Sequence, residues 1–463
     1  MTSVGRHKNI TLLSFSEVEK VEGYVGNFNV TVRKKARYVK EDLCTGCATC
    51  VEKCPWKKVP SKFDLGLGLH PAIYFPFAQA VPRVPVIDTD YCAYFIKGKC
   101  RACEKFCPRN AIDFNQQDEI LEFDVGAIIL ATGFQDYHPD NPADKDHPLK
   151  YGYGSLDNVV TGMEFERLIN SGGPTSGQVR LKDGRKPERI AILHCVGSRD
   201  PSNNEYCSRV CCMYSLKLAH LVRDTVNAEV IEFYRDMRTF GKGYEAFYER
   251  VAHEGVKFIR FDRDIQVCSG TNGRSEQLVI KATDIYSGEP CVEYVDMVVL
   301  ATGMEPQSDQ VSVAHTFGIS RSPDGFFLER NPKLAPVETM SAGIFLAGAC
   351  QGPKDIPDSV AQGGAAACAA LSLMDAGSVT LEPFTAYIDP DLCSGCKTCI
   401  NLCPYTAIES TIYNGRIISQ VNEVLCKGCG TCVAACPSGV AIQHGFTQDQ
   451  VIAEILGILG QVS

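Results

Sequence analysis

The sequence lacks the features that mark membrane proteins and nucleic-acid-binding proteins. No stretch approaches the roughly 20 consecutive apolar residues that cross a bilayer, and the opening MTSVGRHKNI holds no apolar core of a secretion signal. Lysine and arginine (46) are outnumbered by aspartate and glutamate (55), which gives a net charge of −9. This balance provides no electrostatic footprint for nucleic acid or for an anionic membrane. We therefore expect no nucleic-acid partner and no membrane span.

The chain also lacks the glycine motif of dinucleotide-binding proteins. No G-x-G-x-x-G occurs, because each candidate lacks the third glycine and a preceding strand: Gly66-Leu67-Gly68, Gly152-Tyr153-Gly154 and Gly241-Lys242-Gly243. The sequence therefore predicts that the pyrophosphate cradle of an FAD domain is missing. A P-loop, a Ser-His-Asp motif and histidine pairs at metal spacing are absent too, so we expect no hydrolytic or nucleoside-triphosphate chemistry.

Cysteine, by contrast, is abundant, with 24 residues in 463. Sixteen of them form four runs that end in Cys-Pro, two near each end of the chain. The spacing C-x2-C-x2-C-x3-C-P is typical of two-cluster bacterial ferredoxins, in which the fourth cysteine of each run binds the other run's cluster. The C-terminal runs predict the ligand sets Cys393, Cys396, Cys399 and Cys436, and Cys403, Cys426, Cys429 and Cys432. The N-terminal runs, one with a longer first interval, predict Cys44, Cys47, Cys50 and Cys107, and Cys54, Cys92, Cys100 and Cys103.

Two other uses of cysteine fit this pattern less well. A disulfide scaffold is typical of short secreted chains, and zinc suits isolated C-x2-C pairs. Neither explains a third cysteine at the same interval and a Cys-Pro end repeated four times. Soft thiolates at this density select iron–sulfur clusters, and clusters spaced along a chain conduct electrons. The sequence predicts an electron-conducting protein of a reducing compartment, the cytoplasm.

The order of apolar runs predicts an α/β fold with two ferredoxin-like additions. Strands are expected between residues 8 and 40, beginning at Ile10–Leu13 and continuing as a hairpin around Gly26. From about residue 115, strands and helices alternate, which favours a doubly wound parallel sheet. We predict strands of that α/β domain in 1–36, an inserted ferredoxin-like domain in 37–114, the α/β domain in 115–380, a second ferredoxin domain in 381–446, and a short apolar helix packed on the protein in 447–463. Within the insert, Leu65–Val86 is expected to cover the clusters or to form a docking surface.

Two strands are predicted to end in Ala-Thr-Gly, one in Phe123–Gly133 and one in Tyr294–Gly303. Small residues at the carboxyl end of a buried parallel strand let the backbone approach a ligand. Together with Thr339–Ala349 and a helix start at Ile356–Gly364, these strands resemble the flavoproteins related to thioredoxin reductase, although Ala349 replaces the usual aspartate. The resemblance implies an incomplete FAD domain with contacts at Ala131, Thr132, Gly133, Ala301, Thr302, Gly303, Gly348, Ala349, Asp358, Ser359, Val360, Gln362 and Gly363. The alternative for the helix start is simple packing against the sheet.

Four further cysteines lie within the α/β segment, Cys195, Cys207, Cys211 and Cys212. They are either buried structural thiols or ligands that converge on one metal centre from a strand end and a helix start. The run HCVGSRDPSNNEYCSRVCCMYSLKLA, with GPKDIPDSVAQGGAAA and the two ferredoxin modules, resembles HdrA, the flavin- and cluster-bearing subunit of heterodisulfide reductase. The resemblance implies that these four cysteines bind a [4Fe–4S] cluster near FAD. It also places Lys217 near the isoalloxazine with Glu164 as an acidic partner, for which a surface cation and a solvated carboxylate are the alternatives.

The resemblance to HdrA implies flavin-based electron bifurcation between a mid-potential donor, ferredoxin and a terminal reductase, with about five [4Fe–4S] clusters. The expected partners are HdrB/HdrC-like subunits and MvhD/hydrogenase- or formate-dehydrogenase-like subunits. HdrA proteins normally begin with a further cluster domain and the G-x-G-x-x-G unit, so we expect a separate subunit to carry that unit, or else no complete FAD. Two other functions stay open: a flavin-free iron–sulfur relay, and an HdrA-like subunit of a class II benzoyl-CoA reductase or sulfur-metabolism complex.

The remaining cysteines are Cys268, Cys291, Cys350 and Cys368. Because they are scattered singly, we expect them to be packing thiols. Cys350 and Cys368 lie close in sequence to the predicted flavin motif, and contact with the flavin is the alternative for these two.

Overall fold

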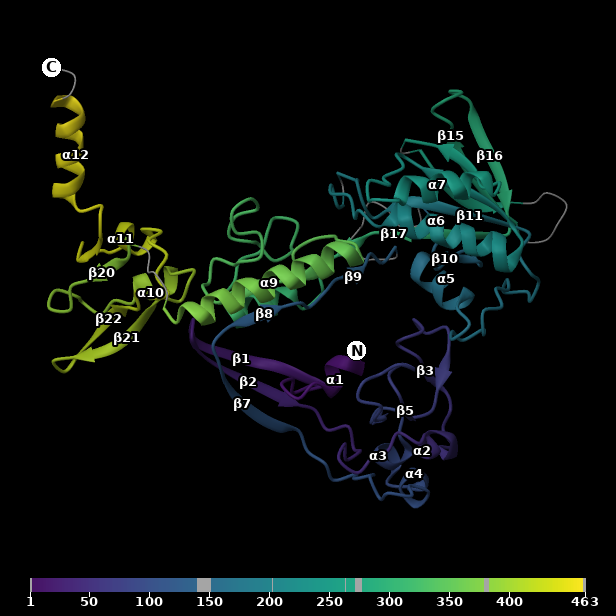
Figure 1. Cartoon of the computed structure of the whole chain (residues 1–463), viewed down its shortest axis with the longest axis horizontal. Helices are drawn as coiled ribbons and strands as arrows, with labels where there is room; N and C mark the ends of the chain where they lie inside the picture. Colours follow the sequence, from purple (N-terminus) through teal and green to yellow (C-terminus); the bar gives the residue numbers. More distant parts are fainter. Residues whose placement is uncertain are drawn as a thin grey trace. The chain divides into compact units, whose positions relative to one another are not determined.

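The computed structural model describes residues 2–139, 151–201, 203–262, 264–270, 277–378 and 383–460 (Figure 1). The chain divides into two compact units, each assembled from separate segments. The first unit comprises residues 1–17, 33–121 and 136–305, and the second comprises residues 18–32, 122–135 and 306–463. The predicted 115–380 domain is therefore shared between the units, and its predicted end at 380–381 lies outside the described residues.

A five-stranded parallel sheet forms the centre of the first unit, in the order β10-β17-β11-β12-β13. Its strands are β10 (Val159–Thr161), β11 (Arg189–Val196), β12 (Glu229–Tyr234), β13 (Lys257–Arg260) and β17 (Met297–Thr302). Residues 190–193 of β11 are all apolar, as a strand covered on both faces requires. The predicted alternation of strands and helices is confirmed in this part of the chain.

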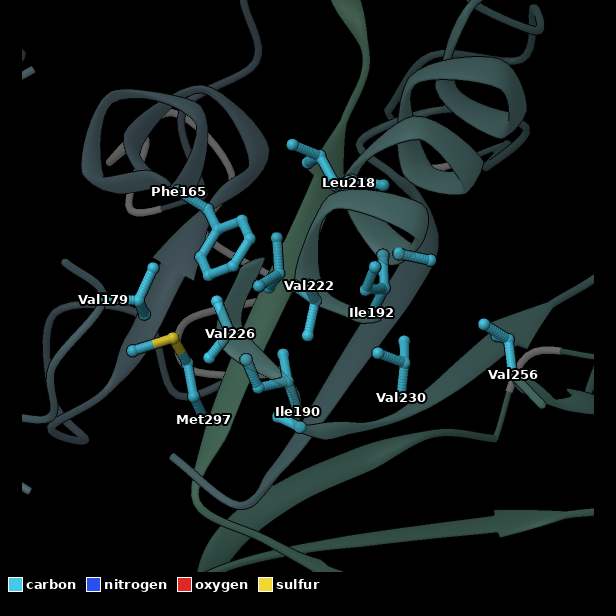
Figure 2. Close-up of a cluster of buried hydrophobic side chains, with 14 of the residues drawn as sticks. Phe165, Val179, Ile190, Ile192, Leu218, Val222, Val226, Val230, Val256 and Met297 are labelled. Carbon is cyan, nitrogen blue, oxygen red and sulfur yellow. The ribbon is translucent and has the colours of Figure 1, made fainter. Parts of the chain in front are cut away.

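Helices cover one face of this sheet, namely α5 (Gly162–Ile169), α6 (Cys211–Leu221) and α7 (Tyr244–His253). A π-helical turn, η1 (Val222–Val226), extends α6. Figure 2 shows Val222 and Val226 of this turn in the same buried cluster as Ile190 and Met297 of the sheet. Burial of each such side chain contributes about 1.5–3 kcal/mol. This layer therefore packs α6 and η1 against the parallel sheet.

An antiparallel sheet covers the other face, with strands β14 (Gln266–Gly270), β15 (Gln277–Thr283) and β16 (Pro290–Val295). Leu278 and Ile280 of β15 belong to a second buried cluster with Leu193 and Phe233 of the parallel sheet. The α/β class is confirmed. In the part of the chain that the structure describes, this second face carries strands in place of the helices that usually cover it in a doubly wound sheet. The predicted strand Tyr294–Gly303 is divided between β16 and β17.

The inserted segment is built from short elements around its cysteines. Its helices are α2 (Thr49–Lys53), α3 (Ala93–Lys97) and α4 (Ala102–Lys105), and its strands pair as β3 (Val59–Pro60) with β4 (Leu69–His70) and β5 (Ile73–Tyr74) with β6 (Val86–Ile87). The buried core includes Cys50, Cys54 and Cys103 beside apolar residues such as Val59 and Ile87. Thiols thus occupy positions that apolar side chains fill in an ordinary core.

Near the N-terminus, the predicted hairpin forms from β1 (Ser16–Tyr24) and β2 (Asn27–Lys34), in a sheet with β7 (Glu119–Val125). Gly26 lies in the turn with φ +84°, a conformation that favours glycine. The prediction of a strand at Ile10–Leu13 is wrong, because no strand includes these residues and only a short helix, α1 (Thr2–Arg6), precedes them. Ile10 and Leu12 are exposed, and alternation alone does not supply the neighbouring strand that a sheet needs.

The second unit contains a parallel pair of strands, β8 (Ile128–Leu130) and β19 (Ile344–Leu346). The long helix α9 (Ile356–Ala376) packs on this pair, with Ala366 and Ala370 in one buried cluster with Phe345. The predicted buried strand Phe123–Gly133 is interrupted, because β7 ends at Val125 and β8 begins at Ile128, and Ile129 is exposed. This unit also contains α8 (Gln310–Phe317) and the 3-10 turn η2 (Gly348–Cys350). The two-residue strands β9 (Gln135–Asp136) and β18 (Met304–Glu305) pair with each other.

The C-terminal segment again consists of short paired strands and helices. β20 (Ala386–Ile388) pairs with β23 (Ala441–Gln443), β21 (Ile408–Tyr413) pairs with β22 (Arg416–Val421), and the helices are α10 (Thr398–Leu402) and α11 (Thr431–Ala434). The final helix, α12 (Gln448–Gly460), has no buried residue, so the prediction that it packs on the protein is wrong for the described residues, which end at 460. Within those residues, no helix combines the length and apolarity that a membrane crossing needs.

Candidate functional site

The insert brings each of its two predicted cysteine sets to the wall of one cavity. The first cavity is lined by Cys44, Cys47, Cys50 and Cys107, and the second by Cys54, Cys92, Cys100 and Cys103. Phe75 and Pro85 also line the first cavity, and Ala72 and Ile73 line the second, so the stretch 65–86 lies over both. Three cysteines of one run thus meet the fourth of the other, which is the crossing found in two-cluster ferredoxins.

Burial controls the acidity of these thiols. It raises the pKa of Cys103 to about 12 and that of Cys50 to about 11, and the charges of neighbouring cysteines add to both increases. Such thiols stay protonated at neutral pH unless a metal takes the place of the proton. Two sulfur atoms also accept backbone hydrogen bonds, Cys44 from Gly46 N–H at 3.4 Å and Cys107 from Ala111 N–H at 3.3 Å. The donor set fits iron–sulfur clusters.

The C-terminal cysteines show the same crossing through their electrostatic neighbours. Burial raises the pKa of Cys432 to about 11, together with the charges of Cys426, Cys429 and Cys403, the three other members of its predicted set. Hydrogen bonds, first of all one with the Thr398 side chain, lower the pKa of Cys396, whereas the charge of Cys436, a member of the same set, acts to raise it. Ala407 N–H donates to Cys403 Sγ at 3.3 Å, four residues apart, as Ala111 does to Cys107 in the insert. The two ends of the chain therefore repeat one local arrangement.

The four cysteines of the α/β segment, which we call the inner set, come together at the edge of the parallel sheet. Cys195 lies at an irregularity in β11 where the register with β17 shifts, and its φ of +61° is unusual for a residue with a side chain. Burial raises the pKa of Cys211 well above its ordinary value, and the charges of Cys195, Cys212 and Cys207 add to this increase. All four sulfur atoms are thus electrostatic neighbours, as one shared cluster requires.

The end of β17 is covered by the loop that joins these cysteines. Ser198 and Ser208 form a buried hydroxyl pair at 2.7 Å, and a Cβ on Gly303 would lie 2.1 Å from Ser198 Oγ and 2.6 Å from Ser208 Oγ. Thr302 O accepts a hydrogen bond from the Tyr214 hydroxyl at 2.7 Å, and Ala301 and Thr302 are buried. The predicted contact of Ala301, Thr302 and Gly303 with FAD stays a prediction, and the loop of the inner set fills the space beside Gly303. Their small size admits the loop of the inner set.

Replacement of Gly303 with alanine should destabilise this packing. We expect Gly303→Ala to lower the free energy of unfolding by about 1–3 kcal/mol, the usual cost of overpacking a filled site. Denaturant unfolding measures this change, and iron analysis shows whether the inner set still holds its metal. Gly364→Ala in α9 is the matched control, because its Cβ would meet no atom within 4 Å, and a helical alanine gains about 1 kcal/mol over glycine. Equal stability of Gly303→Ala and the unsubstituted protein would argue against the close approach.

In the second unit, the other Ala-Thr-Gly motif, residues 131–133, lies where the backbone is not covered by neighbouring side chains. Ala131 and Thr132 follow β8 and are exposed, and Gly133 has φ +77° with no atom near its Cβ position. The end of β19 is adjacent, because Ala347 N–H donates to Leu130 O at 2.9 Å. Gly348, with φ +76°, and Ala349 follow there. The exposed end at 131–133 offers backbone to a ligand, whereas the backbone at 347–349 is engaged in hydrogen bonds such as that from Ala347 N–H to Leu130 O.

The start of α9 lies beside these strand ends and adds a helix N-terminus to the predicted FAD contacts. Asp355 caps the helix by accepting a hydrogen bond from Asp358 N–H at 2.8 Å. The predicted contacts Asp358, Ser359 and Gly363 are half-buried and Val360 is exposed. Gln362 has a structural task, since its Oε1 accepts from Gly348 N–H at 2.7 Å and so ties the helix to the end of β19. The predicted contacts other than 301–303 thus lie around two strand ends and one helix N-terminus, which suits part of a dinucleotide.

Comparison with known proteins agrees with this geometry. A family model for a 4Fe-4S dicluster domain matches residues 385–437, and one for a 4Fe-4S binding domain matches residues 41–62. The HdrA protein of the H(2):CoB-CoM heterodisulfide,ferredoxin reductase of Methanothermobacter thermautotrophicus is 47% identical over 465 residues, which cover 100% of this chain and 68% of that protein. The chain belongs to the HdrA family.

Other HdrA proteins give the same result. The iron-sulfur HdrA protein of the CoB--CoM heterodisulfide reductase of Methanocaldococcus jannaschii is 46% identical over 99% of this chain and 68% of its own length. An HdrA-like protein of Archaeoglobus profundus is 42% identical over 98% of the chain and 69% of its own length. Among solved structures, T. acidophilum thioredoxin reductase covers 66% of the chain and 86% of its own length, at 13% identity and a TM-score of 0.34. As an HdrA protein with [4Fe–4S] domains, the chain is an electron-transferring oxidoreductase component, as the sequence predicts.

The two residues that the HdrA resemblance places near the flavin differ in their surroundings. Lys217 is exposed on α6. Glu164 is engaged at both oxygens, because Oε1 accepts from the Tyr153 hydroxyl at 2.9 Å and Oε2 accepts from Thr161 N–H at 2.7 Å. Thr161 Oγ1 accepts in turn from Glu164 N–H, which completes a capping box at the start of α5. Glu164 therefore caps a helix, and its role toward a flavin stays a prediction, as does that of Lys217.

The cysteines outside the five sets have different environments. Cys350 is fully buried, with its Sγ 3.3 Å from Leu130 O, which fits a packing thiol. Cys268 and Cys291 are half-buried on β14 and β16. Cys368 is exposed on α9, so the prediction of a packing thiol is wrong for this residue.

Sequence reasoning missed a buried polar pair beside the inner set of this HdrA protein. His194 and Glu232 are 3% and 0% exposed, and Nε2 of the first lies 2.8 Å from Oε2 of the second. A signal was present in the sequence, because Glu232 interrupts the apolar run Val230–Tyr234 and His194 directly precedes Cys195. Charged residues rarely occupy such positions without a function.

Proposed function

We propose that the chain carries about five [4Fe–4S] clusters and part of an FAD site, and supports flavin-based electron bifurcation in a heterodisulfide-reductase-type complex. The observation that carries this proposal is the inner set, four thiols built into the sheet of an α/β domain that also bears ferredoxin-type sets. Clusters with different surroundings differ in potential over a range of about −700 to +450 mV. The chain therefore has the parts for several electron exits at separate potentials.

The residues of the chain would hold each cluster by a specific division of tasks. The four thiolates of a set bind iron, and the surrounding apolar side chains limit the access of water. Backbone N–H groups such as those of Gly46, Ala111 and Ala407 donate to ligand sulfurs, and donors of this kind raise the potential of a cluster. The ferredoxin-type domains are assigned to 37–114 and 381–446, and the inner set to the α/β domain between them.

FAD, when bound, accepts an electron pair and passes on its electrons one at a time. The strand ends at 131–133 and 347–349 and the N-terminus of α9 would hold part of it, with exposed backbone at 131–133 and the positive end of a helix dipole. The sequence contains no G-x-G-x-x-G, so a pyrophosphate cradle of that type would come from outside these residues. Lys217 and Glu164 are the proposed side chains near the isoalloxazine.

The names of relatives support the choice of partners. The HdrA protein of the H(2)/formate:CoB-CoM heterodisulfide,ferredoxin reductase of Methanococcus maripaludis is 45% identical over 463 residues. We propose that this chain likewise assembles with HdrB/HdrC-like subunits and with MvhD/hydrogenase- or formate-dehydrogenase-like subunits, and reduces a ferredoxin. One observation favours a second function, a flavin-free relay, namely the absence of the glycine motif from the sequence.

Cofactor analysis of the anaerobically purified complex tests the proposal. We expect about twenty iron atoms per chain, from about five clusters of four, and one flavin per complex. Reduction of the terminal acceptor should require ferredoxin as a second acceptor, in equal numbers of electrons. A complex with full iron but without flavin would exclude bifurcation and leave the relay, and a matched preparation of the chain without partners shows whether flavin binding needs another subunit.

A further inference from the structure

Three charged side chains meet at the edge of the parallel sheet where the inner set lies. Asp236 follows β12, and its two carboxylate oxygens accept hydrogen bonds from Nη2 of Arg199 and from Nη2 of Arg260, each at 2.6 Å. Cys195 lies near the carboxyl end of β11, and Arg260 is the last residue of β13. Because β11, β12 and β13 are neighbouring parallel strands, their carboxyl ends bring these groups to one edge. Fixed ion pairs thus lie at the same edge as a predicted cluster ligand.

Arg199 connects these ion pairs to the inner set. Its Nη1 lies 4.0 Å from Cys195 Sγ, the distance of a long hydrogen bond to sulfur, while Nη2 is bound to Asp236. Two nitrogens of the planar guanidinium are thus engaged at once, which fixes its position. The Arg199 side chain is 20% exposed, so solvent screens its charge only in part. Because arginine is not deprotonated in proteins, a permanent positive charge faces Cys195.

The loop that carries Arg199 has other ties that hold it in place. The backbone N–H of Arg199 donates to Tyr206 O at 2.9 Å, and the carbonyl of Arg199 accepts from Arg235 Nη1 at 2.7 Å. Asn204 Nδ2 donates to Gly197 O at 2.9 Å and closes the loop a second time. Arg199 also has φ +58°, a conformation that glycine or asparagine adopts more readily. The fold of the loop therefore gives no reason for an arginine at this place.

We propose that Arg199 raises the reduction potential of the inner cluster, with Asp236 holding its guanidinium against Cys195 Sγ. This inference rests on the proposed function, which assigns a cluster to the inner set. Reduction adds one electron, whose negative charge the ligand sulfurs share, and Arg199 keeps its protons throughout. A cation that donates to one of these sulfurs stabilises the reduced form more than the oxidised form, and it does so more strongly in a partly buried site than in water.

The charge of Arg199 distinguishes this contact from the backbone donors to the cluster ligands. Ala111 N–H donates to Cys107 Sγ in the insert, and Arg209 N–H donates to Cys207 Sγ in the inner set, both at 3.3 Å. These donors are neutral, whereas the guanidinium of Arg199 carries a full charge, whose effect falls off only with the inverse of the distance. Arg199 would therefore separate the potential of the inner cluster from those of clusters that receive neutral donors.

Redox titration of the anaerobically purified full chain, followed by electron paramagnetic resonance, tests this role. The component that disappears in Cys211→Ala is the inner cluster. In Arg199→Gln we expect its reduction equilibrium to shift at least tenfold toward the oxidised form, which is about 59 mV for one electron. Arg199→Lys, which keeps the charge without the planar fork, should shift the potential by less than half as much. The other components should keep their potentials.

Arg189→Gln is the matched control, because Arg189 begins the strand that contains Cys195 and also pairs with a carboxylate, that of Glu229, at 2.8 Å. It removes the same charge at the other end of β11 and should leave every potential unchanged. An unshifted inner component in Arg199→Gln overturns the proposal and reduces the ion pair to a further tie of the loop. Equal shifts in Arg199→Gln and Arg199→Lys overturn it as well, because the shift would then come from a displaced loop and not from the lost charge.

A second uncharged variant covers the case in which Arg199→Gln fails to load iron. Arg199→Asn fits φ +58° more readily, so it removes the charge with less disturbance of the loop. An unshifted inner component in this variant overturns the proposal equally. If Cys211→Ala removes no component, the inner cluster itself is refuted, which is a separate failure of the proposed function.

Discussion

Replacement of Cys211 with alanine is expected to remove one cluster, about four of some twenty iron atoms per chain, and to leave the others in place. Cys211 is buried at the start of α6, and its pKa is raised by burial and then by the charges of the three other cysteines of the inner set. A thiol in that position is either a cluster ligand or an inert packing group. Only the removal of a ligand would lower the iron content of the chain. Iron and sulfide analysis of the full chain measures the outcome.

Cys350→Ala is the control for this experiment. Cys350 is also fully buried, but it stands alone in the sequence and its sulfur faces the backbone oxygens of Leu130 and Ala347 at 3.3 Å. Its replacement creates a similar small cavity without touching any of the five sets. Full iron content in both variants would show that the inner set holds no cluster, whereas loss of iron in both would point to general instability.

Removal of all iron is expected to unfold the two ferredoxin-type segments while the central sheet persists. The buried core of the C-terminal segment consists of Cys399, Cys426 and Cys432 together with three alanines and two isoleucines. Segments of this size rarely fold on an apolar core alone, and the free energy of metal binding then becomes free energy of folding. The parallel sheet, by contrast, is covered by two extensive apolar clusters.

Amide hydrogen exchange before and after anaerobic chelation of iron tests this expectation. Amides in β20–β23 should lose protection, and those in β11, β12 and β17 should keep it. Two single substitutions serve as a matched pair of controls. Cys436→Ala should expose amides of the C-terminal segment only, and Cys107→Ala those of the insert only. Protection that survives chelation in both segments would mean that their folding does not depend on metal.

The cysteine sets were the part of the site that sequence could predict, because short spacings along a chain translate directly into distances. The two Ala-Thr-Gly motifs show the limit. No atom lies within 4 Å of the Cβ position of Gly133, just after β8. At Gly303, by contrast, this space is filled by Ser198 and Ser208, which come from a loop about a hundred residues earlier in the chain. The local sequence is the same at both places, so only tertiary structure separates an open strand end from a closed one.

Other misses have the same cause. The run from Phe123 to Leu130 is mostly apolar, but its residues belong to two different sheets, and the strand breaks at Gly126 and Ala127. The apolar side chains of α12 predict a packed helix, and the described chain provides nothing that buries them. The pair of His194 and Glu232 was within reach, because a charged residue in the middle of an apolar strand is a signal in itself. Hydrophobic patterns state that a surface must be covered, but they do not identify what covers it.

Because of the small helix α3, the number of residues between Cys92 and Cys100 does not set the distance between these two cysteines. Seven residues lie between Cys92 and Cys100, where the other runs have two, yet both cysteines line the same cavity. The excess chain is wound into Ala93–Lys97, which advances about 7 Å as a helix and about 17 Å if extended, and Gly98 with φ +66° turns it back. The interval is thus a place where chain length can change without loss of a ligand, and shortening it to two residues should restore the ordinary ferredoxin spacing.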